Sequence, residues 1–209
     1  MNEQASPTPQ DWKDLMTEWN QTIIKKLVDR LPPESVQRGW LGNAGATEAE
    51  ITQLENRLGN IKLPPSYRTF LEFTNGWNGR LTKYIYELWS TTQIEWLKDR
   101  HPSIIEDADY YPPEWVTLFG PQVRDIPDEE YFVYGPEQKF LSLRLDYLPG
   151  MLEASNEGNM AIFLLNPKIV SQSGEWEAWF WASWLPGAQR YPSFWKMMTE
   201  QFRDFTNNL

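Results

Sequence analysis

The chain has 209 residues, 41% of them hydrophobic and twelve of them tryptophan, which is enough for one hydrophobic core. It contains no cysteine, which excludes disulfides, thiolate nucleophiles and cysteine metal sites, and its net charge of −10 argues against nucleic acid or an anionic membrane as a direct partner while permitting a basic protein. The start shows no signal pattern and the longest apolar run, at 160–165, is too short to span a bilayer, so we expect a soluble, cytoplasmic protein.

The first predicted element is a helix at residues 9–31. Thr8 is placed to cap it, and Pro32-Pro33 ends it. Its apolar residues follow a helical stripe: Trp12, Leu15, Met16, Trp19, Ile23 and Leu27. We divide the chain into residues 1–35, a disordered tip with an N-terminal helical extension, and residues 36–209, the main domain.

Two further helices are predicted within residues 47–77, with a Leu-Pro-Pro break between them. Thr47 and Glu50 form a capping box, and Gly59 suits the end of the first helix. Pro65 suits the first turn of the second helix, which Asn75-Gly76 ends. The apolar stripes of the two helices are Ile51, Leu54 and Leu58, and then Tyr67, Phe70 and Leu71.

The order and spacing of this run resemble the signature of the SUKH superfamily, whose members include fungal regulators of cell-wall synthesis and bacterial immunity proteins. The residues that carry the resemblance are Ile51, Leu54, Glu55, Leu58, Gly59, Leu63, Pro64, Tyr67, Phe70, Leu71, Asn75 and Gly76. The resemblance extends over residues 40–205 and implies an α+β fold, with helices packed on one face of a mostly antiparallel sheet. The helix at 9–31 lies outside its minimal pattern.

Beyond these helices the chain turns rich in β-prone residues. We predict a strand at 82–89 and a short helix at 91–100. Further strands are predicted at 115–119, 130–134, 140–147, 161–165 and 176–184. Helical periodicity returns at 192–205. Helices first, then a mostly antiparallel sheet and a closing helix, form an α+β order.

The residues offer little for catalysis. His101 is the only histidine, so a Ser-His-Asp triad would have to use it, and a zinc site lacks ligands. No phosphate-binding glycine motif is present. Paired carboxylates suit a glycosidase in principle, but solvated surface acids are the simpler interpretation. We therefore predict a surface histidine, and no enzyme activity, cofactor or metal.

The segment 106–130 concentrates negative charge, with eight acids against the single base Arg124. The acids are Glu106, Asp107, Asp109, Glu114, Asp125, Asp128, Glu129 and Glu130, and the interleaved aromatic residues include Tyr110 and Tyr111. Three interpretations stay open: a solvated face, a docking surface for a cationic protein, or a calcium site without EF-hand spacing. We take these acids other than Glu114, together with the two tyrosines, as candidate partner-binding residues.

Tryptophans supply the remaining candidates. In residues 175–184 every second side chain is apolar and lies on one face of the predicted strand. The other face carries both polar and apolar side chains, and there Trp179 and Trp181 lie with two glutamates. Such a strand is either central and covered on both faces, or partly open and able to grip a partner or stack on a sugar. Trp77 follows a helix stop in a turn that either ends the helix or displays the ring.

Together these observations predict stoichiometric protein binding and no catalysis. The resemblance implies, for a bacterial member, an immunity protein that binds and neutralises a cognate toxin, and the acidic segment suits a basic toxin such as a nuclease. One alternative is an intracellular regulatory or scaffold domain, as the fungal branch of the resemblance implies. A carbohydrate-binding or enzymatic role comes third. The oligomeric state is left open.

Overall fold

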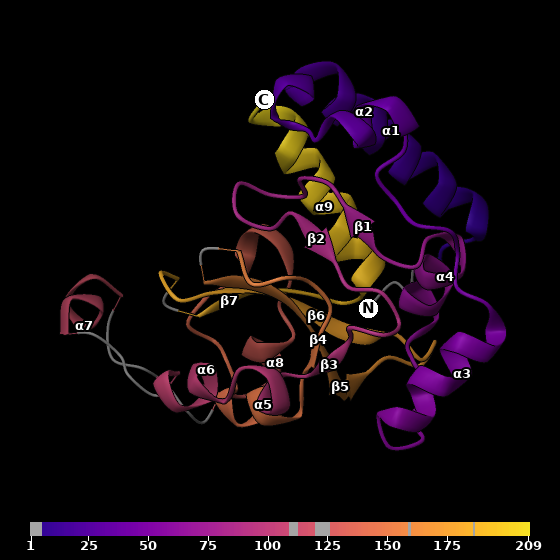
Figure 1. Ribbon diagram of the computed structural model, residues 1–209. Helices are drawn as coiled ribbons and strands as arrows, with labels where there is room; N and C mark the ends of the chain where they lie inside the picture. Colours follow the sequence, from indigo (N-terminus) through magenta and orange to yellow (C-terminus); the bar gives the residue numbers. More distant parts are fainter. Residues whose placement is uncertain (1–5, 109–112, 120–125, 159, 186) are drawn as a thin grey trace.

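An antiparallel sheet forms the centre of the molecule (Figure 1). The computed structural model describes residues 6–108, 113–119, 126–158, 160–185 and 187–209. Within this part, one sheet has the order β3-β4-β5-β6-β7, with every neighbouring pair antiparallel, and β1 pairs with β2 in a second sheet. The strands are β1 Trp77–Asn78, β2 Glu87–Leu88, β3 Glu95–Trp96, β4 Leu152–Glu153, β5 Ala161–Val170, β6 Trp176–Ala182 and β7 Ala188–Tyr191. The predicted α+β class and mostly antiparallel sheet are confirmed.

Strand β6 buries large side chains on both of its faces. Phe180 lies opposite Phe163 of β5 and joins the larger apolar cluster. Trp179 and Trp181 point to the other face and join a second cluster. Alternating side chains that are apolar in both directions require cover on both sides of a sheet. The interpretation of this strand as a core element is therefore confirmed.

The longer helices cover the face of the larger cluster. They are α1 Pro9–Leu27, α3 Glu48–Arg57, α4 Pro65–Phe73 and α9 Phe194–Asn207. Thr8 and Thr47 cap α1 and α3 as predicted, each within a capping box. Trp12 of α1 contacts Phe70 of α4 and Trp195 of α9, at ring-centroid separations of 5.2 and 4.8 Å. The N-terminal helix therefore shares one core with α4 and α9.

Residues that carry the family resemblance hold α3 against α4. Ile51, Leu54, Leu58, Phe70 and Leu71 are all buried, as their stripes predict. The periodicity of 192–205 predicts the same burial for Trp195 and Phe202, but these two side chains are only half-buried. Glu55 is also buried, and it accepts the Leu63 backbone N–H at 3.1 Å and the Lys62 ammonium at 2.6 Å. Burial alone would raise the pKa of Glu55, but these bonds outweigh it and hold the pKa below its usual value. The ionised carboxylate thus closes the turn between the two helices.

Short helices cover the opposite face. They are α5 Leu97–Arg100, α6 Pro102–Asp107, α8 Asp128–Tyr131 and the 3₁₀ helix η3 Leu145–Gly150. Leu97, Leu148 and Ile104 from these segments pack against the Trp179 and Trp181 side of the sheet. The long helices form the layer that the sequence predicts on one face of the sheet. The short helices cover the second face.

Three predicted strands are wrong. Helix α7 Pro113–Phe119 replaces the strand predicted at 115–119, and α8 and the turn after it replace the one at 130–134. Helix α7 begins at Pro113, and proline suits the first turn of a helix. The acids in the first turn of α8 interact favourably with the dipole of that helix. In place of a strand at 140–147 there is a turn, an irregular stretch and the start of η3.

Other differences are smaller. The predicted strand at 82–89 contracts to β2, and the predicted helix at 91–100 divides into β3 and α5. The sequence predicts neither β4 nor β7, which are short strands. The remaining elements are the 3₁₀ helices η1 Val28–Arg30 and η2 Gly135–Glu137, and helix α2 Pro33–Arg38.

Candidate protein-binding surface

The described acids of the 106–130 segment lie on α6, α7 and α8. Glu106 and Asp107 on α6, and Glu129 on α8, are exposed. Figure 1 shows α7 projecting from the body of the molecule, beyond α6. Four candidates fall outside the described residues: Asp109, Tyr110, Tyr111 and Asp125. We use "acidic surface" below for Glu106, Asp107, Glu114 and Asp128 to Glu130.

Two acids of this surface already have cationic neighbours. Asp128 accepts from the Arg144 guanidinium at 2.6 Å. Glu130 accepts from the Ser142 hydroxyl at 2.6 Å and lies 3.4 Å from the Lys139 ammonium. The Ser142 hydrogen bond lowers the pKa of the Glu130 carboxyl, so it stays ionised. These two carboxylates fix the local structure, and less of their charge is available to a partner.

The other acids keep their charge available. Within the part of the chain that the structure describes, Glu106, Asp107, Glu114 and Glu129 make no ion pair. A partner with Lys or Arg side chains would therefore meet unneutralised carboxylates at these positions.

Exposed apolar side chains accompany the acids on α7. Val116 is 46% exposed, and Leu118, at 71%, is the most exposed large hydrophobic residue in the described part. Protein interfaces commonly place apolar groups at their centre and polar groups at the rim. Helix α7 therefore presents an apolar contact beside the charged groups of the acidic surface.

A buried polar cluster holds α8 on the sheet. Glu177 of β6 accepts hydrogen bonds from the Tyr131 hydroxyl at 2.7 Å and the Tyr134 hydroxyl at 3.0 Å. Arg190 of β7 lies 3.4 Å from the same carboxylate and donates to the Tyr131 carbonyl. Asn166 and the Trp179 ring N–H complete the donor set of Glu177, at 3.1 and 2.6 Å.

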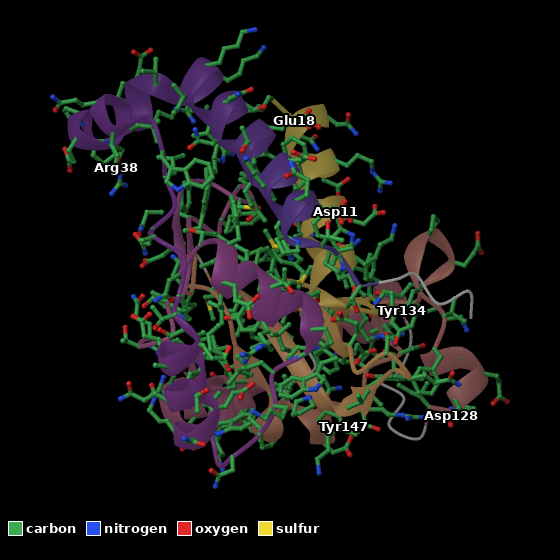
Figure 2. The ribbon with its side chains drawn as sticks, turned by 90° about the vertical axis from the view of Figure 1, so that its right-hand side faces the viewer. Asp11, Glu18, Arg38, Asp128, Tyr134 and Tyr147 are labelled. Atoms are coloured by element: carbon green, nitrogen blue, oxygen red, sulfur yellow. The ribbon has the colours of Figure 1, made fainter. Side chains whose placement is uncertain are left out.

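This cluster is a rigid support for α8, which carries Asp128 to Glu130 of the acidic surface. Glu177 and Arg190 are both fully buried, and burial followed by the Glu177 charge raises the pKa of Tyr131 and of Tyr134. Both phenols thus remain donors throughout the physiological pH range. Figure 2 shows Asp128 and Tyr134 on the same side of the molecule, with Arg38 of α2 at the opposite end of the view.

The tryptophan candidates belong to the core. Trp77 and Trp179 are fully buried, and Trp181 is 8% exposed. Trp77 packs edge-on against Trp40 at 5.3 Å, and Trp179 donates to Glu177. The interpretation of an open Glu/Trp face, or of a displayed Trp77 ring, is therefore wrong. No platform for a sugar exists at these three positions.

His101 is also placed differently from the prediction of a plain surface histidine. Its Nδ1 lies 2.9 Å from a carboxylate oxygen of Glu153, which is fully buried on β4. The Trp89 ring N–H donates to the other oxygen at 3.2 Å, and Arg100 lies 3.6 Å from it. Burial raises the pKa of Glu153 above its usual value. The sequence carries no local signal for this pair, because 52 residues separate the partners.

Replacing His101 with alanine should therefore lower stability. The change removes one hydrogen-bonding partner from the buried carboxylate of Glu153, and we expect a loss of about 1–3 kcal/mol in the free energy of unfolding. Chemical denaturation followed by tryptophan fluorescence measures it. Lys98→Ala, an exposed change on the same helical stretch, is the matched control. Equal stability of both variants would restore the surface interpretation of His101.

The described residues hold no metal cluster. No group of three or more His, Cys, Asp or Glu side chains among them is arranged to bind a metal ion, so this part of the chain offers no site for the calcium interpretation. Among the same residues, no helix has the length and apolar character to cross a membrane.

Comparison with known proteins returns one family. The model of the SMI1 / KNR4 family (SUKH-1) matches residues 45–207. The match spans the chain from α3 to the end of α9, and it leaves α1, η1 and α2 outside. A search of curated proteins finds none that matches.

Proposed function

Because the chain belongs to the SMI1 / KNR4 family (SUKH-1), we propose that it acts by stoichiometric binding of a basic protein partner. In its specific form, the proposal is an immunity protein that binds a cognate toxin in the cytoplasm and covers the toxin's functional surface. It assigns no catalytic step to this chain.

The observation that supports this proposal is the combination of free charge and rigid support. Glu106, Asp107 and Glu129 are exposed carboxylates without intramolecular cations in the described part. The Glu177–Arg190 cluster holds α8, and with it Glu129, on the sheet through Tyr131. A preorganised charged surface loses little conformational entropy on binding, and it steers the encounter with a partner of opposite charge.

A capture experiment from the native host tests the proposal. The full chain serves as bait, and the expected catch is one basic protein at one-to-one stoichiometry. The variant Glu106→Lys/Asp107→Lys/Glu129→Lys should capture markedly less of it, because reversed charges repel a cationic partner. Asp14→Lys/Glu18→Lys/Glu34→Lys changes the net charge equally, on the exposed surfaces of α1 and α2, and should capture as much as the wild type.

The identity of the captured protein separates the immunity role from a regulatory one. A toxin should arrest growth when it is produced alone, and co-production of this chain should restore growth. A captured protein that is harmless by itself would favour the scaffold role. Equal capture by both triple variants would remove the acidic surface from the proposal.

A further inference from the structure

A cleft of about 270 Å³ lies between the N-terminal segment and the β1–β2 hairpin. We call it the hairpin cleft. One wall is mostly apolar and comes from the end of α1, from η1 and from the residues after it: Ile23, Leu27, Arg30, Leu31 and Pro32. The opposite wall is mostly polar and comes from the hairpin and the loop after β4: Asn78, Gly79, Arg80, Tyr86, Glu87 and Asn156.

Two arginines, Arg30 and Arg80, contribute positive charge to the lining of this cleft. Arg30 is exposed and has no ion pair within the described part of the chain. Arg80 donates from Nε to the Thr82 carbonyl at 3.0 Å, which leaves its terminal nitrogens without a partner among the described residues. The single acid of the lining, Glu87, accepts from the Gln93 amide at 3.3 Å. A chain of net charge −10 thus keeps two unpaired cations at one cleft.

The apolar wall and Tyr86 restrict the type of ligand further. Tyr86 is 50% exposed, and its hydroxyl donates to the Lys83 carbonyl at 3.1 Å. This hydrogen bond restricts the orientation of the ring, which lines the cleft. Leu27 and Leu31 add aliphatic surface to the lining of the cleft. Binding sites that combine apolar walls with a few convergent polar groups suit organic ligands, and ~300 Å³ is the lower end of their usual size.

We propose that the hairpin cleft binds a small organic anion. Its carboxylate or phosphate group pairs with Arg30 and Arg80, since guanidinium groups bind both anions through paired N–H donors. Its apolar or planar body lies against Leu27, Leu31 and the Tyr86 ring.

This site is separate from the proposed function. Leu27, Arg30 and Leu31 precede residue 45, where the family match begins, so the cleft joins this chain's N-terminal segment to the family domain. Figure 1 shows α2 at one end of the molecule and α6 and α8 toward the other, with β1 and β2 between them. An anion in the cleft and a cationic protein on the acidic surface therefore do not compete for the same groups.

A titration of the full chain with defined probes, followed by amide NMR, tests the proposal. Phenylacetate and phenyl phosphate should bind saturably and shift the amides of Gly79, Arg80 and Tyr86. Neutral phenylacetamide and inorganic phosphate should each bind at least about tenfold more weakly, because the first lacks the negative charge and the second lacks the apolar body. The tighter of the two anions identifies the acid group that the cleft prefers.

Matched variants locate the binding. Arg30→Met and Arg80→Met keep most of the aliphatic stem and remove the charge, and each should weaken anion binding about tenfold. Arg203→Met on α9 removes an exposed cation outside the cleft and should leave binding unchanged. Absence of saturable binding by both anions would overturn the proposal, as would unchanged affinity in the Arg30→Met/Arg80→Met double variant.

Discussion

Glu177→Ala should destabilise the protein more than any change on the acidic surface. The substitution leaves Arg190 as a buried, unpaired cation, and it removes the acceptor of Tyr131, Tyr134, Asn166 and Trp179. Removing one member of a buried ion pair typically costs about 3–5 kcal/mol. We expect a loss in that range in the free energy of unfolding, measured by chemical denaturation. Glu129→Ala, an exposed acid, should change it by less than about 0.5 kcal/mol.

A double variant shows whether the unpaired charge causes this loss. Glu177→Leu/Arg190→Met removes both charges and fills similar space, and it should be more stable than Glu177→Ala, because no buried cation is left behind. A double variant no more stable than Glu177→Ala would assign the cost to the tyrosine and tryptophan hydrogen bonds instead. A loss below about 1 kcal/mol for Glu177→Ala would contradict the buried cluster altogether.

Trp12→Ala is the second change with a large expected effect. Trp12 is fully buried between Phe70, Phe194 and Trp195, and its ring N–H donates to the Ser66 carbonyl at 3.1 Å. Truncating a buried tryptophan typically costs about 3–5 kcal/mol. Thermal unfolding should show a correspondingly large drop in Tm.

The neighbouring change Lys13→Ala is the control for this experiment. Lys13 is exposed on the same helix, and its loss should leave Tm nearly unchanged. If Trp12→Ala also leaves Tm unchanged, α1 does not belong to the common core. The N-terminal helix would then be an appendage, and the hairpin cleft would lose one of its walls.

Local signals in the sequence predict the longer helices α1, α3, α4 and α9 well. The side chains of Thr47 and Glu50 satisfy backbone groups within the same turn, so the start of α3 needs no distant contact. Gly59 adopts a φ of +98° after α3, which glycine accepts readily. The apolar stripes of α4 and α9 point to the core because the helical period is local.

Short strands and helices after residue 90 depend on contacts between distant segments. Strand β3 exists because Glu95 and Trp96 pair with Glu153 and Leu152, far along the chain. The aromatic and β-branched residues at 115–119 suggest a strand, yet among the described residues no strand pairs with this segment. β-propensity reports suitability for a sheet, and it does not supply the neighbouring strand.

The candidate site was partly visible in the sequence. The concentration of acids was evident, but the pairing of Asp128 with Arg144 and of Glu130 with Lys139 is a tertiary property. Glu177 offered one usable signal, because a carboxylate inside a tryptophan-rich, two-sided strand requires a buried cation or several donors. Sequence alone does not identify Arg190 as that cation.

Association kinetics test the central claim, that the acidic surface binds a basic partner, most directly. The protein captured from the host is mixed with the wild-type chain in a stopped-flow instrument at low and high salt. We expect an association rate constant that falls steeply with salt, and a rate at low salt that is at least about tenfold lower for Glu106→Lys/Asp107→Lys/Glu129→Lys. The control variant Asp14→Lys/Glu18→Lys/Glu34→Lys should associate much faster than the acidic-surface variant. Equal rate constants for the wild type and the acidic-surface variant at low salt would contradict the account.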